Sequence, residues 1–168
     1  MNSLLKNFLE NWKEVNQTTL NLILAVPEKF YHQKPFAPRF KSFAWEFSCI
    51  LSTRLGYLRG FNVGQLDESC FLETDEELEK LSKEMMITKL RSTNLKIEQI
   101  IKDEKKIKIN YFGKEVSKYN VISWLLQHEQ LHYGKLILYF SKKKIKIPTS
   151  LKKMWGENSF KQDKKLSR

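Results

Sequence analysis

The spacing of large apolar residues restricts the fold of this chain more than any other feature of its sequence. In four long segments these residues recur at steps of three and four, which places them on one face of an α-helix. The segments cover residues 3–26, 41–60, 75–103 and 117–141. Helices of about 20 residues or more, joined by loops of moderate length, typically pack as a bundle. The sequence therefore predicts an all-α fold, a four-helix bundle.

Local signals indicate where the predicted helices begin and end. Pro27 ends the first helix, and the proline-rich stretch after it predicts a loop. Ser42 is the expected N-cap of the second helix, and Gly60 suits its C-terminal cap. Thr74 is the expected N-cap of the third helix, and Glu77 three residues later completes a capping box.

The remaining segments complete the predicted domain organisation. Residues 106–113 alternate between polar and apolar side chains and end in glycine, which predicts a short strand or β-hairpin before the last helix. A chain of 168 residues fits one domain with one core. We therefore expect residues 1–156 to form the bundle and residues 157–168 to form a basic C-terminal tail.

The positive charge of the chain is concentrated near its C-terminus. Lys and Arg number 30 against 19 Asp and Glu, a net charge of +11, and residues 141–168 contribute ten basic and two acidic side chains to it. Such a segment can contact nucleic acid or acidic lipid, or it can be a solvated, lysine-rich terminus. No nucleic-acid-binding motif accompanies the charge. We therefore favour the solvated terminus and do not expect nucleic acid as a partner.

Several features indicate the cellular environment. No apolar run approaches the ~20 residues that a membrane span needs. The first residues carry charges too early for the apolar core of a signal peptide. Two cysteines, Cys49 and Cys70, are too few for a secreted disulfide scaffold. We expect a reduced, cytoplasmic protein without membrane contact.

A pair of histidines marks the last predicted helix. His128 and His132 are four residues apart, so both imidazoles point the same way, about one turn from each other. Buried imidazoles need partners for their nitrogens, and either a divalent ion, zinc or nickel, or ordinary hydrogen bonds can supply them. The pair lies in one narrow, mostly apolar stripe of the helix, which we expect to face the bundle interior: Val121, Leu125, His128, His132, Leu136 and Tyr139.

The same segment matches the zincin pattern, two histidines around Glu129 as a general base. A zincin takes its third ligand from a following segment. The only later carboxylates are Glu157 and Asp163, after a short basic stretch. We therefore do not expect a protease.

Five short segments from both halves of the chain form a pattern: KSFAWEFSCI at 41–50, YLRG at 57–60, HEQLHYG at 128–134, IPTS at 147–150 and MWG at 154–156. With these segments, residues 3–156 resemble the DinB-like (YfiT-like) superfamily of bundles. The second helix resembles the one that carries the family's first metal ligand, and the fourth resembles its paired-histidine helix.

The resemblance implies a bundle that holds a divalent metal ion through three histidines, and it also implies a homodimer. Here the position that resembles the second-helix histidine is Cys49, seven residues after Ser42. A thiolate is a good zinc ligand, so Cys49, His128 and His132 would form the site. The alternative is that Cys49 is an inert buried thiol and that metal binding is weak or absent. Glu46 is a weaker candidate ligand, while Cys70 and the loop residue His32 are not expected to take part.

Members of the superfamily include enzymes that transfer or isomerise groups with low-molecular-weight thiols. The resemblance thus implies a divalent-metal-dependent enzyme, a thiol-dependent S-transferase or a related transferase or hydrolase, that acts on a small-molecule substrate. In that interpretation Glu129 accepts a proton or braces a metal ligand. The alternative is a non-catalytic bundle without metal that binds a small molecule or a protein.

Overall fold

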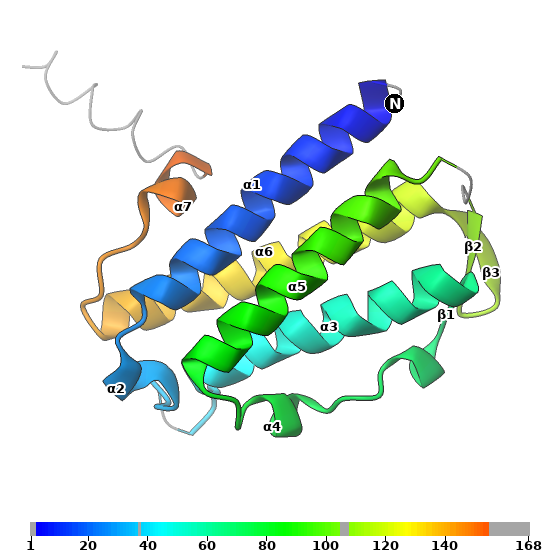
Figure 1. Ribbon diagram of the computed structural model, residues 1–168. Coiled ribbons are helices and arrows are strands. Elements are labelled where there is room, and N and C mark those ends of the chain that lie inside the picture. Colours follow the sequence, from blue (N-terminus) through cyan, green and yellow to red (C-terminus); the bar gives the residue numbers. More distant parts are fainter. Residues whose placement is uncertain (1–2, 37, 105–107, 155–168) are drawn as a thin grey trace, which may run out of the picture.

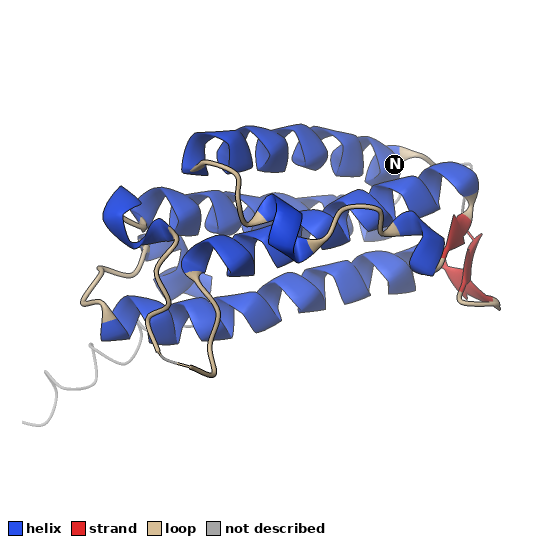
Figure 2. Ribbon diagram, turned by 90° about the horizontal axis from the view of Figure 1, so that it is seen from below, coloured by secondary structure: helices blue, strands red, loops and turns tan. Residues whose placement is uncertain are grey.

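Four long helices form a bundle in the computed structural model, which describes residues 3–36, 38–104 and 108–154 (Figure 1). They are α1 (Ser3–Ala25), α3 (Phe43–Val63), α5 (Lys83–Lys102) and α6 (Lys118–Lys142). Helix α3 packs against both α5 and α6, and α1 covers the same two helices from the other side. The predicted all-α four-helix bundle is confirmed. Figure 2 shows the long helices running along a common direction.

Shorter elements connect and extend the bundle. Helix α2 (Glu28–Tyr31) lies in the stretch that the sequence predicts as a loop, so that prediction is wrong for these four residues. A 3-10 turn, η1 (Glu68–Cys70), and helix α4 (Asp75–Leu78) follow α3, and α7 (Thr149–Met154) packs on α1. The predicted basic tail at 157–168 lies outside the described residues. Within the described ranges, no helix is long and apolar enough to cross a bilayer.

A small sheet closes one end of the bundle (Figure 2). Strands β2 (Lys108–Tyr111) and β3 (Lys114–Ser117) form a hairpin before α6, as predicted, with Phe112 and Gly113 at positive φ in its turn. The predicted range, 106–113, reaches only to this turn and misses β3. The third strand, β1 (Gln65–Leu66), pairs in parallel with β2. Strand β1 could not be predicted from the sequence, because two residues are too few to show an alternating pattern.

Capping residues explain where α3 begins and ends. The Ser42 hydroxyl accepts a hydrogen bond from the Trp45 N–H, as predicted for an N-cap. The prediction that Gly60 ends this helix is wrong. The helix continues to Val63, and Gly64 at a φ of 80° is its left-handed C-cap.

The predicted third helix at 75–103 is two helices. Thr74 and Glu77 form the expected capping box, but α4 ends after one turn. A second N-cap, Ser82, accepts a hydrogen bond from the Met85 N–H and begins α5. The chain therefore turns between these two N-caps, and α4 packs against α3.

Candidate metal centre

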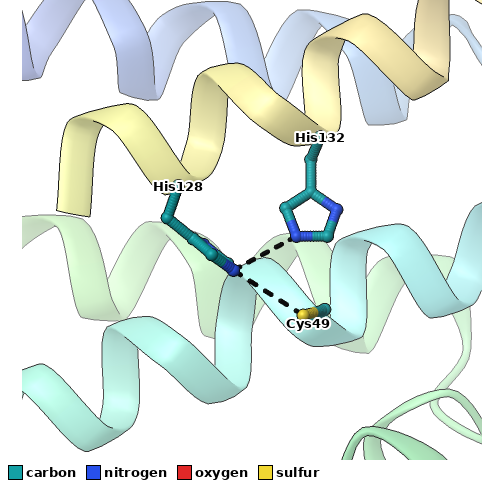
Figure 3. A group of neighbouring side chains, drawn as sticks. All are labelled: Cys49, His128 and His132. Carbon is teal, nitrogen blue, oxygen red and sulfur yellow. Dashed lines mark hydrogen bonds between the residues drawn. The ribbon is translucent and has the colours of Figure 1, made fainter. Parts of the chain in front are cut away.

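The three predicted ligands lie close together between α3 and α6: Cys49, His128 and His132. Cys49 lies on α3, and the two imidazoles reach toward it from α6 (Figure 3). Nε2 of His128 is 3.7 Å from the Cys49 Sγ and 3.2 Å from Nε2 of His132. One donor atom from each residue lies within 4.8 Å of the other two. His132 is buried and the other two side chains are half-buried. The predicted inward-facing stripe of this helix is confirmed except at His128, since the other members are buried: Val121, Leu125, His132, Leu136 and Tyr139.

The three donors fit a zinc ion by their chemistry and their separations. Zinc takes imidazole nitrogen at about 2.0–2.1 Å and thiolate sulfur at about 2.3 Å in a tetrahedron, which puts neighbouring donors about 3.3–3.6 Å apart. Two of the three separations, 3.2 and 3.7 Å, lie near those tetrahedral edges, and the third pair, Cys49 and His132, is within 4.8 Å. Sites with three protein ligands of this kind leave a fourth position for water or substrate.

Glu46 fixes the ring of His132. Its Oε2 lies 2.6 Å from His132 Nδ1, and its Oε1 accepts a hydrogen bond of 2.8 Å from the Tyr139 hydroxyl. Burial raises the pKa of Glu46, but the hydrogen bonds from His132 and Tyr139 outweigh it and bring that pKa below its usual value. The oxygens of this candidate ligand are therefore directed at His132 and Tyr139.

His128 is a neutral imidazole in this setting. Burial, and then the electrostatic effect of the neighbouring His132, lower its pKa to about 4. Its Nε2 also lies 3.4 Å from the Thr53 hydroxyl, while its buried Nδ1 has no hydrogen-bond partner in the described part of the chain. A histidine binds a metal ion only as the neutral ring, and His128 meets that requirement at neutral pH.

The Cys49 thiol is protonated in the absence of an ion. Burial, followed by the charge of Asp75 and a hydrogen bond with it, raises the pKa of Cys49 to about 12. Asp75 begins α4 and also accepts a hydrogen bond of 2.5 Å from the Ser52 hydroxyl. The sequence does not connect Asp75 to the site. An acidic residue in the first turn of a helix is already accounted for by its favourable interaction with the helix dipole.

Glu129 points into the core of the bundle and joins a different group of residues. Its two oxygens accept hydrogen bonds of 2.7 and 2.8 Å from the Arg54 guanidinium, and the Thr19 hydroxyl donates a third of 2.6 Å. The Tyr133 hydroxyl lies 3.5 Å from the same carboxylate. These contacts give Glu129 a structural role, and its predicted catalytic role stays a prediction.

The other candidate residues lie elsewhere. Cys70 is buried, its thiol donates to the Gln65 carbonyl oxygen, and neither cysteine forms a disulfide. His32 caps the end of α2 and stacks edge-on with Tyr31. A cavity of about 540 Å³ opens between α3 and α5, and none of the three donors lines it.

Comparison with solved structures supports the fold. The DinB-like protein YjoA of Bacillus subtilis matches with a TM-score of 0.67 and 19% identity, over 84% of this chain and 95% of that one. A DinB-like protein of Bacillus cereus ATCC 10987 matches with a TM-score of 0.66 and 15% identity, over 85% of this chain and 95% of that one. No protein-family model and no curated protein matches the sequence. The chain has a DinB-like fold, and the class that fold and site define is a DinB-like helical bundle with a candidate metal centre.

Proposed function

We propose that this protein binds a divalent metal ion, zinc or nickel, through Cys49, His128 and His132, and acts as a metal-dependent enzyme on a low-molecular-weight thiol. The observation that carries the proposal is the convergence of one sulfur and two imidazole nitrogens within 4.8 Å. The reaction class, a thiol-dependent S-transfer or a related group transfer or hydrolysis, rests on the resemblance of the two motif helices to the DinB-like superfamily.

The chemistry follows from the residues that lie between α3 and α6. A bound metal ion supplies Lewis acidity, which lowers the pKa of a coordinated thiol and makes it a nucleophile near neutral pH. Cys49, His128 and His132 would hold the ion, and partial burial of the group keeps water from competing strongly with it. The Cys49 proton must leave when the ion binds, and the carboxylate of Asp75 lies beside that thiol to receive it.

Metal analysis of protein without a histidine tag tests the site. After incubation with Zn²⁺ or Ni²⁺ and dialysis, we expect about one ion per chain, as for a three-ligand site. Alanine at Cys49, or at both His128 and His132, should abolish stoichiometric binding. The matched control is Cys70→Ser, which removes the other thiol and should bind normally, because Cys70 bonds to Gln65 away from the group. Wild-type protein with less than about a tenth of an ion per chain would contradict the proposal.

A second assay tests the reaction class. The metal-loaded protein is mixed with a panel of low-molecular-weight thiols and a chloronitroaromatic electrophile. In the expected substitution the thiol sulfur bonds to the aromatic carbon, chloride leaves and the thiol proton is released to solvent. Metal-dependent product formation with at least one thiol supports the transferase, while equal rates with His128→Ala/His132→Ala argue against it.

A metal-free binding bundle is the second candidate, and one observation favours it. The three side chains can satisfy one another without an ion, since a proton on Nε2 of His128 can be donated to Nε2 of His132 beside a neutral Cys49 thiol. The melting temperature distinguishes the two. A ligand that binds only the folded state stabilises it by RT ln(1 + [L]/Kd), so a chelator should lower the melting temperature of a metalloprotein and leave a metal-free bundle unchanged.

The homodimer implied by the resemblance is also a proposal. It is tested by the mass of the full chain in solution, measured by light scattering over a range of concentrations. A dimer mass that persists on dilution supports it, and a mass of about one chain contradicts it.

A further inference from the structure

The carboxylate of Glu46 is almost fully removed from water, with 1% of the side chain exposed. It lies on α3 three residues before Cys49, so the two side chains share one side of the helix. A buried carboxylate destabilises a fold unless other groups satisfy its charge and its lone pairs. The partners of Glu46 therefore show what this charge does between α3 and α6.

Among the described residues, the polar partners of the Glu46 carboxylate all come from α6. His132 Nδ1 and Lys135 Nζ lie 2.6 and 3.4 Å from one oxygen, and the Tyr139 hydroxyl lies 2.8 Å from the other. The three partners occupy positions i, i+3 and i+7 of one helix, so they form a single stripe. The stripe holds the carboxylate in one place, and the carboxylate in turn fixes the His132 ring.

The contact determines which nitrogen of His132 carries hydrogen. An ionised carboxylate only accepts hydrogen bonds, so the proton of the neutral ring lies on Nδ1. Nε2 is then left with a free lone pair, and it faces Nε2 of His128 at 3.2 Å. His128 differs, because its own buried Nδ1 has no hydrogen-bond partner among the residues described.

We propose that Glu46 is a positioning residue, which holds the proton of His132 on Nδ1 and thereby directs the Nε2 lone pair toward the point shared with His128 and Cys49. The inference rests on the proposed function, because the direction of the His132 lone pair matters only if the site binds a metal ion. The tautomer and the orientation of the His132 ring can be measured without any metal. Carboxylates that orient a ligating histidine in this way raise its basicity and its affinity for the ion.

The test uses the full chain with ¹⁵N-labelled histidine. In metal-free wild-type protein at neutral pH, NMR should show Nδ1 of His132 protonated and Nε2 bare, with the resonances assigned through His32→Gln and His128→Gln. Glu46→Gln should mix the two tautomers, because the amide can present its NH₂ group to Nδ1 as well as its oxygen. In chelator competition the same variant should bind Zn²⁺ about 10- to 100-fold more weakly.

Two controls separate positioning from a general effect of a buried charge. Glu129→Gln alters another fully buried carboxylate that touches neither imidazole, so it should leave the His132 tautomer unchanged. Tyr139→Phe removes one partner of Glu46 without touching His132, and it should keep the tautomer while preserving most of the affinity for Zn²⁺. Glu46→Asp, which keeps the charge, should restore part of what Glu46→Gln loses.

The outcomes are distinct. A wild-type His132 protonated on Nε2 overturns the inference, and so does a Glu46→Gln protein with an unchanged tautomer and unchanged affinity for Zn²⁺. A wild-type protein that binds no Zn²⁺, but whose His132 tautomer depends on Glu46, supports the positioning role and removes the proposed metal function.

Discussion

Arg54 and Glu129 face each other across the centre of the bundle through two parallel hydrogen bonds of 2.7 and 2.8 Å, and neither side chain is exposed to solvent. The guanidinium also donates to Asn16 and lies 4.8 Å from the centre of the Trp12 ring, so α1, α3 and α6 meet at this pair. Breaking a buried pair leaves an unpaired charge in a dry core, which costs far more than losing an exposed one.

The first prediction concerns this pair. Arg54→Met should lower the free energy of unfolding by about 3–5 kcal/mol, because Glu129 then stays buried without its partner. Replacing both residues with leucine should cost less than the single substitution, since no charge is left behind. Urea unfolding followed by circular dichroism measures both. The control is Lys108→Met in the exposed pair with Glu115, which should change stability by about 0–1 kcal/mol.

A second prediction follows from the raised pKa of Cys49. Its pKa rises from 9.0 to about 12, so between these values the folded chain holds a proton that the unfolded chain has lost. Stability from this group is therefore fully present below about pH 9 and is lost as the pH rises toward about 12. Only the thiolate reacts with iodoacetamide, so at pH 8 the metal-free folded protein should be alkylated at Cys49 about a thousandfold more slowly than in urea.

Mass spectrometry of the modified peptide measures this rate, in a Cys70→Ser background that leaves one thiol. Asp75→Asn removes a neighbouring charge that contributes to the shift and should speed the reaction. Equal rates in folded and unfolded protein would show that the thiol is not protected in the way that its burial requires.

The pattern of the sequence was sufficient for some parts of the site and insufficient for others. The two histidines could be predicted because four residues make one helical turn, and Cys49 followed from the resemblance of its helix. Asp75 could not be predicted, because the segment that brings it beside Cys49, residues 64–74, shows no periodic pattern in the sequence. The core role of Glu129 could not be predicted either, because the sequence does not show that Arg54 on another helix faces it.

The break between α4 and α5 also could not be predicted from the sequence, and it gives a third testable prediction. Apolar periodicity continues through residues 75–103, and it hides the second N-cap at Ser82. Ser82→Ala should destabilise the protein by about 1 kcal/mol, because the Met85 N–H loses its acceptor at the start of α5. Thermal unfolding measures the loss. Ser92→Ala, at an exposed position within α5, is the matched control and should cost nothing, since alanine is the better helix former.

Two helical glycines give the last prediction, because the same substitution should have opposite effects at them. A Cβ on Gly60 would lie 2.6 and 2.9 Å from side-chain atoms of Leu66, a buried residue of β1, and 3.2 Å from the Gln65 carbonyl oxygen. Backbone and a buried leucine cannot both move aside, so Gly60→Ala should loosen β1 from α3 and cost about 1–3 kcal/mol. At Gly134 on α6 a Cβ meets no heavy atom within 4 Å.

Gly134→Ala should therefore stabilise the protein by about 0.5–1 kcal/mol, because alanine lowers the conformational entropy of the unfolded chain and is the better helix former. Chemical denaturation of the two variants beside wild type gives both values, and hydrogen exchange at Asn110 and Phe112 reports on β1 directly. Their N–H groups donate to the carbonyl oxygens of Gly64 and Leu66. Faster exchange at these two amides in Gly60→Ala, with unchanged exchange in Gly134→Ala, is the expected result. Equal stabilisation by both substitutions would mean that α3 and β1 do not pack as closely as the structure shows.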